Sequence, residues 1–276
     1  MCRWLAYSGP SMFLDELILK PEHSLIDQSL AARASTTATN GDGFGVAWYG
    51  KRDTPGLYRS IRPAWNDLNL RDLASHIESP LFLAHVRQAT EAPVQQSNCH
   101  PFRFGAYSFL HNGKVEDFRR LRRSLSLAIA EEFYPCLQGS TDSEILFYLA
   151  LSFGLRENPL LAMEKMVGLV EAEAREADIA DPLYMTAAAS NGKALWAFRY
   201  TSNGRSPSLY LCRGRAAFQD FHPRCDQIPE EARLVVSEPL FELSGPWEQV
   251  PEATALRLTK DQVELHPFRP IAPKVS

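Results

Sequence analysis

The chain lacks the features that mark membrane, secreted and nucleic-acid-binding proteins. Its longest nearly continuous apolar run, from Ile145 to Leu155, is far shorter than the roughly 20 residues that cross a bilayer. The acidic residues Asp15 and Glu16 stand where a secretory signal would have its apolar segment. The 29 basic and 33 acidic residues leave a formal charge of −4, which offers no general attraction for nucleic acid or anionic lipid. These absences predict a cytoplasmic globular protein with no membrane and no nucleic-acid partner.

Cysteines are few and scattered along the 276 residues. They are odd in number and form no C-x-x-C pair, so they predict neither a disulfide framework nor a zinc site: Cys2, Cys99, Cys136, Cys212 and Cys225. The histidines His85, His100 and His111 match no common metal-binding spacing, even together with Cys99 and Asp142. We therefore expect no metal and no other cofactor, and interpret His100 as a residue that organises a site by hydrogen bonding.

Apolar patterning predicts strands in the first part of the chain, then helices, then strands again. The expected strands cover residues 2–8 (ending at Gly9-Pro10), 44–49, 57–62, 81–88, 107–110, 184–189, 194–200, 208–213, 233–237, 255–259 and 262–267. The expected helices cover a mixed region up to about Ala34, then residues 116–127, 141–153 and 158–174. This order favours an α+β architecture of packed layers over a βαβ repeat. Because no linker divides the chain, we expect a single domain over residues 1–276.

A basic run, Arg119 to Arg123, lies within the expected helix 116–127. At helical spacing these arginines form a solvated face opposite an apolar stripe. No aromatic platform for stacking bases accompanies them, so the run does not predict nucleic-acid binding.

Cys2 is the first candidate catalytic residue. Methionine aminopeptidases remove Met1 when the second residue is small, which would leave a terminal cysteine with both a thiol and a free α-amine. The reference pKa of an α-amine is about 8, so the amine can accept the thiol proton without help from a histidine. Alternatively, Cys2 has no catalytic role and is simply a residue at the start of a strand.

Three further positions carry chemistry that an amide-cleaving thiol needs. The pair Asn112-Gly113 offers a side-chain amide and a backbone N–H as oxyanion donors, although the same pair is common in turns. Arg87 could bind the carboxylate of an amino-acid substrate, and Asp142 its ammonium group. Alternatively, Arg87 is a solvated residue at a strand end, and Asp142 stabilises the start of a helix.

These residues stand in motifs that resemble those of the class II glutamine amidotransferases, members of the N-terminal nucleophile (Ntn) hydrolase superfamily. The opening Met-Cys-Arg-Trp-Leu-Ala-Tyr is similar to that of a stand-alone branch, which includes the ergothioneine-pathway γ-glutamyl hydrolase and glutathione-degradation amidotransferase subunits. Five further motifs follow in the family's order: Asn-Gly-Asp-Gly-Phe-Gly-Val-Ala-Trp-Tyr at 40–49, an arginine-containing strand ending in Ala-Thr at 87–90, Asn-x-His-Pro at 98–101, His-Asn-Gly at 111–113 and Thr-Asp-Ser-Glu at 141–144.

The resemblance implies a four-layer αββα sandwich with Cys2 at the end of a central strand. It implies that Asn112 and Gly113 form the oxyanion hole, and that Arg87 and Asp142 bind the carboxylate and the ammonium group of a glutamyl substrate. The catalytic motifs then lie in residues 2–144, and residues 145–276 form a branch-specific part.

Two stretches leave questions open. The His-Arg-Gly triplet of larger family members is absent, and Arg33 is the arginine nearest its place. The stretch Ser237-Glu238-Pro239-Leu240 resembles the branch, either as a structural strand end or as a border of the substrate opening.

The expected activity is cleavage of the γ-glutamyl amide of glutamine or of a γ-glutamyl compound, through a γ-glutamyl thioester on Cys2. No synthase domain or phosphate-binding loop follows, so the enzyme either hydrolyses its substrate alone or works with a separate synthase or peptidase subunit. The alternative is a non-catalytic amino-acid-binding or scaffold protein with the same fold. That alternative predicts the loss of a catalytic position, and none is lost. The sequence does not indicate an oligomeric state.

Overall fold

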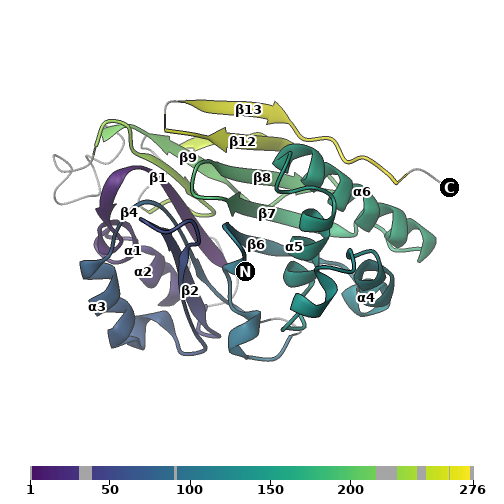
Figure 1. Ribbon diagram of the computed structural model, residues 1–276, viewed down its shortest axis with the longest axis horizontal. Helices are drawn as coiled ribbons and strands as arrows, with labels where there is room; N and C mark the ends of the chain where they lie inside the picture. The colour runs from purple at the N-terminus through teal and green to yellow at the C-terminus, as the bar shows by residue number, and fades with distance from the viewer. Residues whose placement is uncertain are drawn as a thin grey trace.

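The computed structural model describes residues 2–30, 39–89, 92–215, 229–240, 247–260 and 262–273. Two antiparallel sheets lie face to face at its centre, and helices cover the outer face of each sheet (Figure 1). This arrangement confirms the expected α+β, four-layer αββα sandwich.

The first sheet contains strands from both ends of the chain. Within the described residues its strands are β1 (Arg3–Phe13), β2 (Phe44–Tyr49), β3 (Gly56–Ser60), β4 (Glu78–Val86), β9 (Tyr210–Arg213), β10 (Arg233–Val236) and β11 (Glu248–Gln249). Their spatial order is β11-β9-β10-β1-β4-β2-β3, so β1 lies near the middle between β4 and β10. Its outer face is covered by α1 (Asp15–Ile18), α2 (Leu25–Leu30) and α3 (Leu68–His76).

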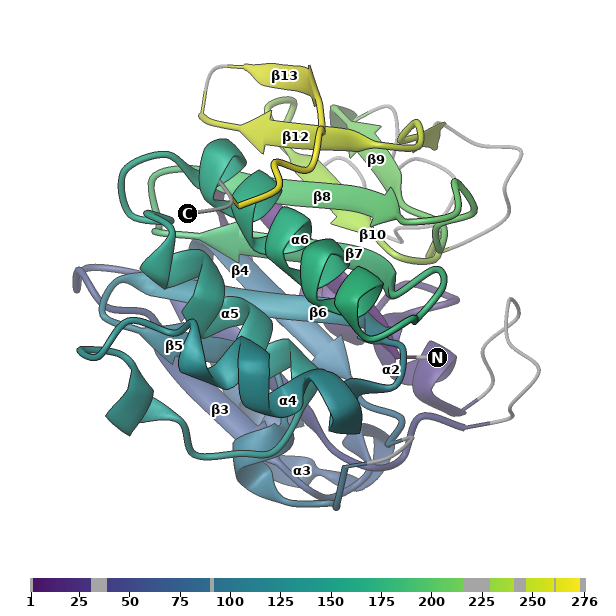
Figure 2. The same cartoon turned by 90° about the vertical axis from the view of Figure 1, so that its right-hand side faces the viewer.

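The second sheet comes from the middle and the end of the chain. Its described strands are β5 (Phe102–Phe104), β6 (Tyr107–Val115), β7 (Leu183–Ser190), β8 (Leu195–Thr201), β12 (Thr254–Leu258) and β13 (Val263–Pro267), in the spatial order β13-β12-β8-β7-β6-β5. Three helices cover its outer face, namely α4 (Phe118–Leu127), α5 (Asp142–Ser152) and α6 (Pro159–Glu176) (Figure 2).

Each interface between layers has its own apolar core. Between the two sheets, Trp4 and Ala6 of β1 pack with Leu110 of β6 and Ala188 of β7. Because side chains alternate along a strand, Leu5 and its like-facing neighbours point instead toward the helices α1 to α3. By the same alternation Cys2 shares the inter-sheet side with Trp4, which places it in the middle of the sandwich.

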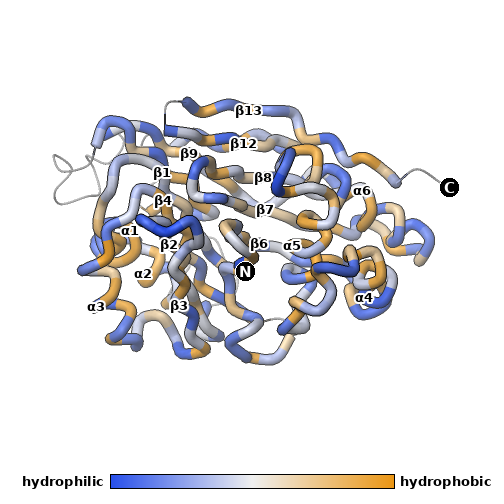
Figure 3. The backbone as a smooth tube through the Cα atoms, viewed as in Figure 1, coloured by the Kyte–Doolittle hydropathy of each residue, from blue (hydrophilic) through white to orange (hydrophobic). Residues whose placement is uncertain are grey.

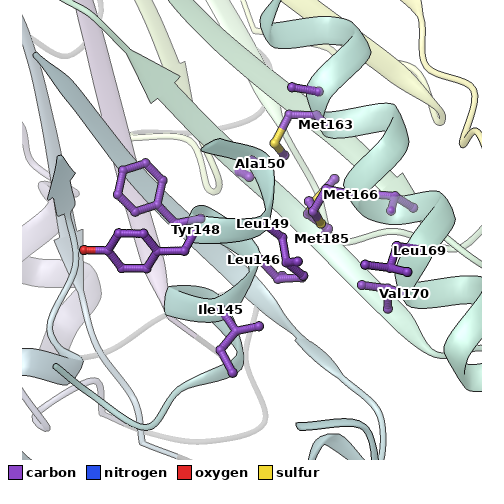
Figure 4. Close-up of a cluster of buried hydrophobic side chains, with 14 of the residues drawn as sticks. Ile145, Leu146, Tyr148, Leu149, Ala150, Met163, Met166, Leu169, Val170 and Met185 are labelled. Atoms are coloured by element: carbon purple, nitrogen blue, oxygen red, sulfur yellow. The ribbon is translucent and has the colours of Figure 1, made fainter. Parts of the chain in front are cut away.

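Helix α5 is apolar on all sides because it lies between the second sheet and its two neighbouring helices. Figure 4 shows Leu146 and Leu149 of α5 facing Met166 and Val170 of α6, with Met185 of β7 beside them. In contrast, the tube of α4 alternates between the hydrophilic and hydrophobic colours in Figure 3, as expected for a helix with one buried face. The predicted caps are confirmed at two helices: the Thr141 hydroxyl accepts the N–H of Glu144, and the Asn158 side chain accepts the N–H of Leu161, both over 3.2 Å.

Two strands extend beyond their expected ends. Strand β1 does not stop at Gly9-Pro10 but continues to Phe13, because a register irregularity between Ser8 and Met12 accommodates the proline. Strand β6 continues past Leu110 to Val115, so His111, Asn112 and Gly113 lie within a strand and not in a turn. The elements α3, β5 and β11 were not expected from the sequence. No helix in the described part of the chain is long and apolar enough to span a bilayer.

Candidate active site

The Cys2 thiol lies at the N-terminal end of β1, beside Gln88, two residues after the end of β4. The backbone N–H of Gln88 donates to Cys2 Sγ over 3.3 Å. Burial raises the pKa of the Cys2 thiol, and this rise is opposed by the Gln88 N–H and by the charges of Arg87 and Arg3. The thiol is therefore protonated near neutral pH and needs a proton acceptor before it can act as a nucleophile.

A cavity of about 360 Å³ joins segments that are distant in the sequence. Five of the six predicted site residues line it: Cys2, Arg87, His100, Gly113 and Asp142. They come from the start of β1, the end of β4, the segment before β5, strand β6 and the start of α5. The fold thus brings together residues that the sequence spreads over 140 positions (from 2 to 142).

Asn112, the sixth predicted residue, is adjacent to the lining in β6. Strand alternation places its side chain with Leu110 on the inter-sheet side, the side that Cys2 shares. It is opposite Thr186 in the β6–β7 register, and Trp4 Nε1 donates to Thr186 Oγ1 over 3.1 Å. No hydrogen bond to another described residue engages the Asn112 amide, which leaves its N–H groups available to a ligand.

Gly113 is required by a close approach of two strands. A Cβ atom at this position would lie 1.8 Å from the carbonyl oxygen of Tyr184 in β7. Any other residue would therefore push β6 away from β7 at the cavity wall.

Arg87 is buried and held by the loop carbonyls around it. Its Nη2 donates to the carbonyl oxygens of Ala92 (3.2 Å) and Pro93 (3.4 Å), and its Nη1 to that of Asp42 (3.4 Å). The Asp42 carboxylate also accepts the N–H of Ala89 over 2.8 Å. These contacts leave the Nε–H and one Nη1–H for a bound anion, and they rule out the alternative of a solvated strand end.

The turn before β2 has a structural reason for its glycines. Gly43 has φ +117°, and a Cβ there would lie 2.6 Å from Cys99 Sγ. Its carbonyl accepts the N–H of Arg87 over 2.8 Å. The motif at 40–49 thus fixes the segment that carries Arg87.

The Asp142 carboxylate is fixed by backbone N–H groups. It accepts from Val115 (2.8 Å) on one oxygen and from Ser143 (2.7 Å) on the other. Ser143 Oγ lies 2.8 Å from His111 Nδ1, and His111 Nε2 lies 3.2 Å from the carbonyl oxygen of Tyr184. Because a carbonyl can only accept, Nε2 carries the proton; burial lowers the pKa of His111, which keeps the ring neutral, so Nδ1 accepts from Ser143.

His100 forms part of the cavity wall together with a second histidine, His85. Their rings lie 4.3 Å apart between centroids and are tilted by 43°, and His100 also packs edge-on against Phe102. Burial lowers the pKa of His85 to about 3 and that of His100 well below its usual range, so both rings are neutral. Within the described structure, none of their four ring nitrogens has a hydrogen-bond partner, and the expected hydrogen-bonding role of His100 in the site stays a prediction.

Several residues that shape the site were not predicted to do so. Asn98 holds two loops together, since its side chain donates to the carbonyl of Pro93 (2.9 Å) and accepts the N–H of Ser140 (2.9 Å). The Glu144 carboxylate accepts the N–H groups of Gln138 (2.9 Å) and Gly139 (2.7 Å). Both residues belong to the sequence motifs at 98–101 and 141–144, and this membership is the sign in the sequence that they contribute to the site.

Part of the cavity lining is cationic. Lys114, Arg119 and Arg122 line it, together with Glu116, which pairs with Lys114. Neither Arg119 nor Arg122 forms an ion pair within the described residues. All four arginines of the basic run are exposed, as expected for a solvated face, and two of them also line the cavity that contains Cys2.

In the described part of the chain, no group of three or more His, Cys, Asp or Glu side chains is arranged to hold a metal ion. Met1 and Arg33 lie outside the described residues.

Comparison with known proteins identifies the family. A profile described as "Glutamine amidotransferases class-II" matches residues 18–228. The chain belongs to this family. Membership identifies it as an enzyme of the class II amidotransferase type, as the motifs predicted.

Two curated relatives of this amidotransferase align over long stretches. It is 32% identical over 302 residues to the probable glutamine amidotransferase DUG3 of Saccharomyces cerevisiae, covering 97% of this chain and 84% of the relative. It is 33% identical over 177 residues to the gamma-glutamyl-hercynylcysteine sulfoxide hydrolase of Mycolicibacterium smegmatis, covering 63% of this chain and 72% of the relative. Both names agree with the predicted branch of the class II amidotransferases.

Solved structures support the same assignment. A glutamine aminotransferase class-II domain protein from Silicibacter pomeroyi is 34% identical, with a TM-score of 0.75 and coverage of 98% of this chain and 99% of that one. The glutamine phosphoribosylpyrophosphate amidotransferase of B. subtilis is 13% identical with a TM-score of 0.65, and the match covers 98% of this chain and 50% of that one. The second likeness concerns the fold alone, which is the Ntn-type sandwich of class II amidotransferases.

Proposed function

We propose that this protein cleaves the γ-glutamyl amide bond of glutamine or of a γ-glutamyl compound, with Cys2 as the nucleophile. The main support is the single cavity that Cys2 shares with Arg87, Gly113 and Asp142. Such a cavity supplies a thiol, a cation, an anion and an oxyanion donor within reach of one amino-acid substrate. Family membership supports the same chemistry.

In the proposed first half of the reaction, Cys2 is acylated. After removal of Met1, the free α-amine of Cys2 takes the thiol proton, and Sγ forms a bond to the amide carbon. The resulting oxyanion accepts hydrogen bonds from the Asn112 side chain and the Gly113 N–H. The C–N bond then breaks, the proton passes from the Cys2 ammonium to the leaving nitrogen, and a γ-glutamyl thioester remains. Because burial raises the pKa of the thiol, the amine is needed as the proton acceptor.

In the proposed second half, water attacks the thioester while the α-amine accepts a proton from it. The C–S bond breaks, Sγ takes the proton back, and glutamate leaves. The same oxyanion donors serve both halves, because both pass through a tetrahedral intermediate at the same carbon.

Arg87 and Asp142 are the residues proposed to bind the glutamyl group. Arg87 would bind the α-carboxylate through its two free N–H groups, and Asp142 the α-ammonium through the remaining lone pairs of its fixed carboxylate. His100, on the cavity wall, is the proposed third contact with the substrate. Because protein contacts already fix Arg87 and Asp142, binding costs little side-chain entropy.

We further propose that residues 1–276 act as one domain, with the catalytic motifs in 2–144 and residues 145–276 as its branch-specific part. The amine or ammonia that leaves is either released or passed to a separate synthase or peptidase subunit. An assay of glutamate release by the purified chain alone distinguishes these routes.

Mass spectrometry after exposure to 6-diazo-5-oxo-L-norleucine, a glutamine-like electrophile, tests the proposal. The expected result is a chain without Met1 that carries a single adduct on Cys2, and an unlabelled Cys2→Ser variant. Retention of Met1, or no adduct on Cys2, contradicts the proposed nucleophile.

A further inference from the structure

A buried cluster of ionisable side chains lies next to the start of β1. Arg3 Nε donates to Glu238 Oε2 over 2.5 Å, and His23 Nε2 lies 3.1 Å from the other oxygen, Oε1. The three side chains come from β1, the loop before α2 and the segment after β10. All three residues are buried, with exposed fractions of 3% for Arg3, 5% for Glu238 and 6% for His23.

This cluster reaches the backbone of Cys2. Arg3 Nη1 donates to the carbonyl oxygen of Cys2 over 3.0 Å, while Nε of the same guanidinium binds Glu238. One planar group therefore connects the Glu238 carboxylate to the residue that carries the proposed nucleophile. A guanidinium has a rigid fork, so fixing one edge of it also fixes the other.

The start of β1 pairs with β4 from Arg3 onward, but its backbone pairing is incomplete on the other side. The ladder between β1 and β10 begins only at Leu5, opposite Val236. Beyond it, Ser237 takes over: its N–H donates to the Trp4 carbonyl (3.0 Å), and its Oγ accepts the Trp4 N–H (2.9 Å). Chain ends fray where such contacts are missing, and Cys2 is one residue before the strand begins.

Glu238 is itself held in place. Gln28 Nε2 donates to the carbonyl oxygens of Glu238 and Pro239, both over 3.3 Å, and to that of His23 over 3.2 Å. The carboxylate thus has a fixed backbone and, among the described residues, the partners Arg3 and His23.

We propose that Glu238 is a positioning residue that holds Cys2 in its attacking geometry through Arg3. The proposal rests on the proposed role of Cys2 as the nucleophile. It gives the Ser237-Glu238 stretch a role in positioning the nucleophile, although this stretch lies in the half of the chain that carries no recognisable catalytic motif. Glu238 supports the backbone on one side of Cys2, while Gln88 contacts the thiol on the other.

The test compares two electrophiles on the same thiol. Attack on 6-diazo-5-oxo-L-norleucine needs the thiol in register with a bound glutamyl group, whereas iodoacetamide reacts with any accessible thiolate. In Glu238→Gln, we expect the rate of Cys2 labelling by the first reagent to fall about tenfold or more, and that by iodoacetamide to stay within about threefold. The kcat for release of glutamate falls by a similar factor, and KM changes by less than about threefold.

The matched control is Glu252→Gln. Glu252 is a half-buried carboxylate that also pairs with an arginine, Arg199 at 4.0 Å, and accepts the backbone N–H groups of Thr201 and Ser206. It lies outside the lining of the cavity. This variant loses stability without a change in the ratio of the two labelling rates.

Unchanged labelling and kcat in Glu238→Gln overturn the proposal, and so does an equal loss in Glu252→Gln. Should Glu238→Gln fail to fold, Arg3→Lys is the second variant. It keeps the charge but cannot contact Glu238 and the Cys2 carbonyl with one planar group, so the ratio of rates must still fall. A wild-type protein that does not react with the glutamine-like reagent contradicts the proposed function instead, which keeps the two failures distinct.

Discussion

Trp4 donates its indole N–H to the hydroxyl of Thr186 over 3.1 Å, and this hydrogen bond joins the strand that follows Cys2 to the strand opposite Asn112. Both side chains are buried between the sheets. The bond therefore crosses the central interface of the sandwich within two residues of the proposed nucleophile. A buried donor has no water to replace a lost partner.

We expect Thr186→Val to lower the free energy of unfolding by about 1–3 kcal/mol, because the Trp4 N–H is left without an acceptor. Trp4→Phe removes the donor, so the Thr186→Val change costs less in that background. Urea unfolding of the two single variants and the double variant measures the coupling. Strictly additive effects would show that the hydrogen bond contributes nothing.

Asn112→Ala removes one of the two proposed oxyanion donors. We expect kcat to fall by about 10²–10³, as for other single donors of this type, with a small change in KM. Steady-state release of glutamate measures both constants. Asn191→Ala, in the hairpin between β7 and β8, is the control for the loss of an amide side chain and should keep its kcat; a near-normal kcat in Asn112→Ala removes Asn112 from the mechanism.

Gly113→Ala should destabilise the fold because its Cβ would meet the Tyr184 carbonyl at 1.8 Å. We expect a loss of several kcal/mol, or no folded protein, since the strands β6 and β7 must separate there. Gly50→Ala is the matched control, because a Cβ at Gly50 meets nothing within 4 Å. Thermal unfolding of the two variants gives the comparison, and equal melting temperatures contradict the prediction.

The buried histidines make stability depend on pH. Burial lowers the pKa of His85 to about 3 from its ordinary value of 6.5, so between these values the unfolded chain binds a proton that the folded chain does not. Stability is therefore complete above about pH 6.5 and falls as the pH drops toward 3. His100 and His111 act in the same direction.

His85→Phe should flatten this dependence and raise stability at pH 5, because it replaces an unpartnered buried imidazole by an apolar ring. Urea midpoints at pH 7 and pH 5 measure the effect. His76→Phe, at the exposed end of α3, controls for the loss of a histidine and leaves the slope unchanged. An equally steep acid loss in His85→Phe would show that His85 does not titrate in this range.

The cationic residues that line the cavity predict which leaving groups the proposed enzyme prefers in its substrates. Arg119 and Arg122 line the same cavity as Cys2 and form no ion pair with another described residue, so a carboxylate on the leaving amine could pair with their guanidinium groups. We expect Arg119→Gln and Arg122→Gln to raise KM several-fold for a γ-glutamyl amino acid and to leave that for glutamine nearly unchanged. Arg123→Gln, on the same helix but outside the cavity, should change neither constant; equal effects on both substrates contradict the prediction.

Many helices and strands of the fold could be predicted because their sequence signals are local. The caps at Thr141 and Asn158 and the strand at 44–49 follow from neighbouring residues, and the structure has them at those positions. The strand β6 was predicted too short, since Asn112-Gly113 is a turn signal locally and only the close approach of Tyr184 reveals why a glycine stands inside a strand.

The sequence predicts the residues of the candidate site, but it does not predict the residues that hold them in place. The motifs name Cys2, Arg87 and Asp142, and the structure brings all three to one cavity. The residues that hold them depend on contacts between distant segments. Asn98 reaches Ser140 across 42 positions, and Arg3 reaches Glu238 across 235, a pairing that no local pattern encodes.

The place of β10 in the first sheet has a consequence for how the protein is made. Strand β1 leaves the ribosome before its neighbour on one side, β4, which ends at Val86. Its neighbour on the other side begins only at Arg233. Until that late segment is synthesised, the nascent chain exposes β1 as an open sheet edge, which invites pairing with other chains. The whole segment between Val86 and Arg233 must therefore be synthesised before β1 is enclosed on both sides.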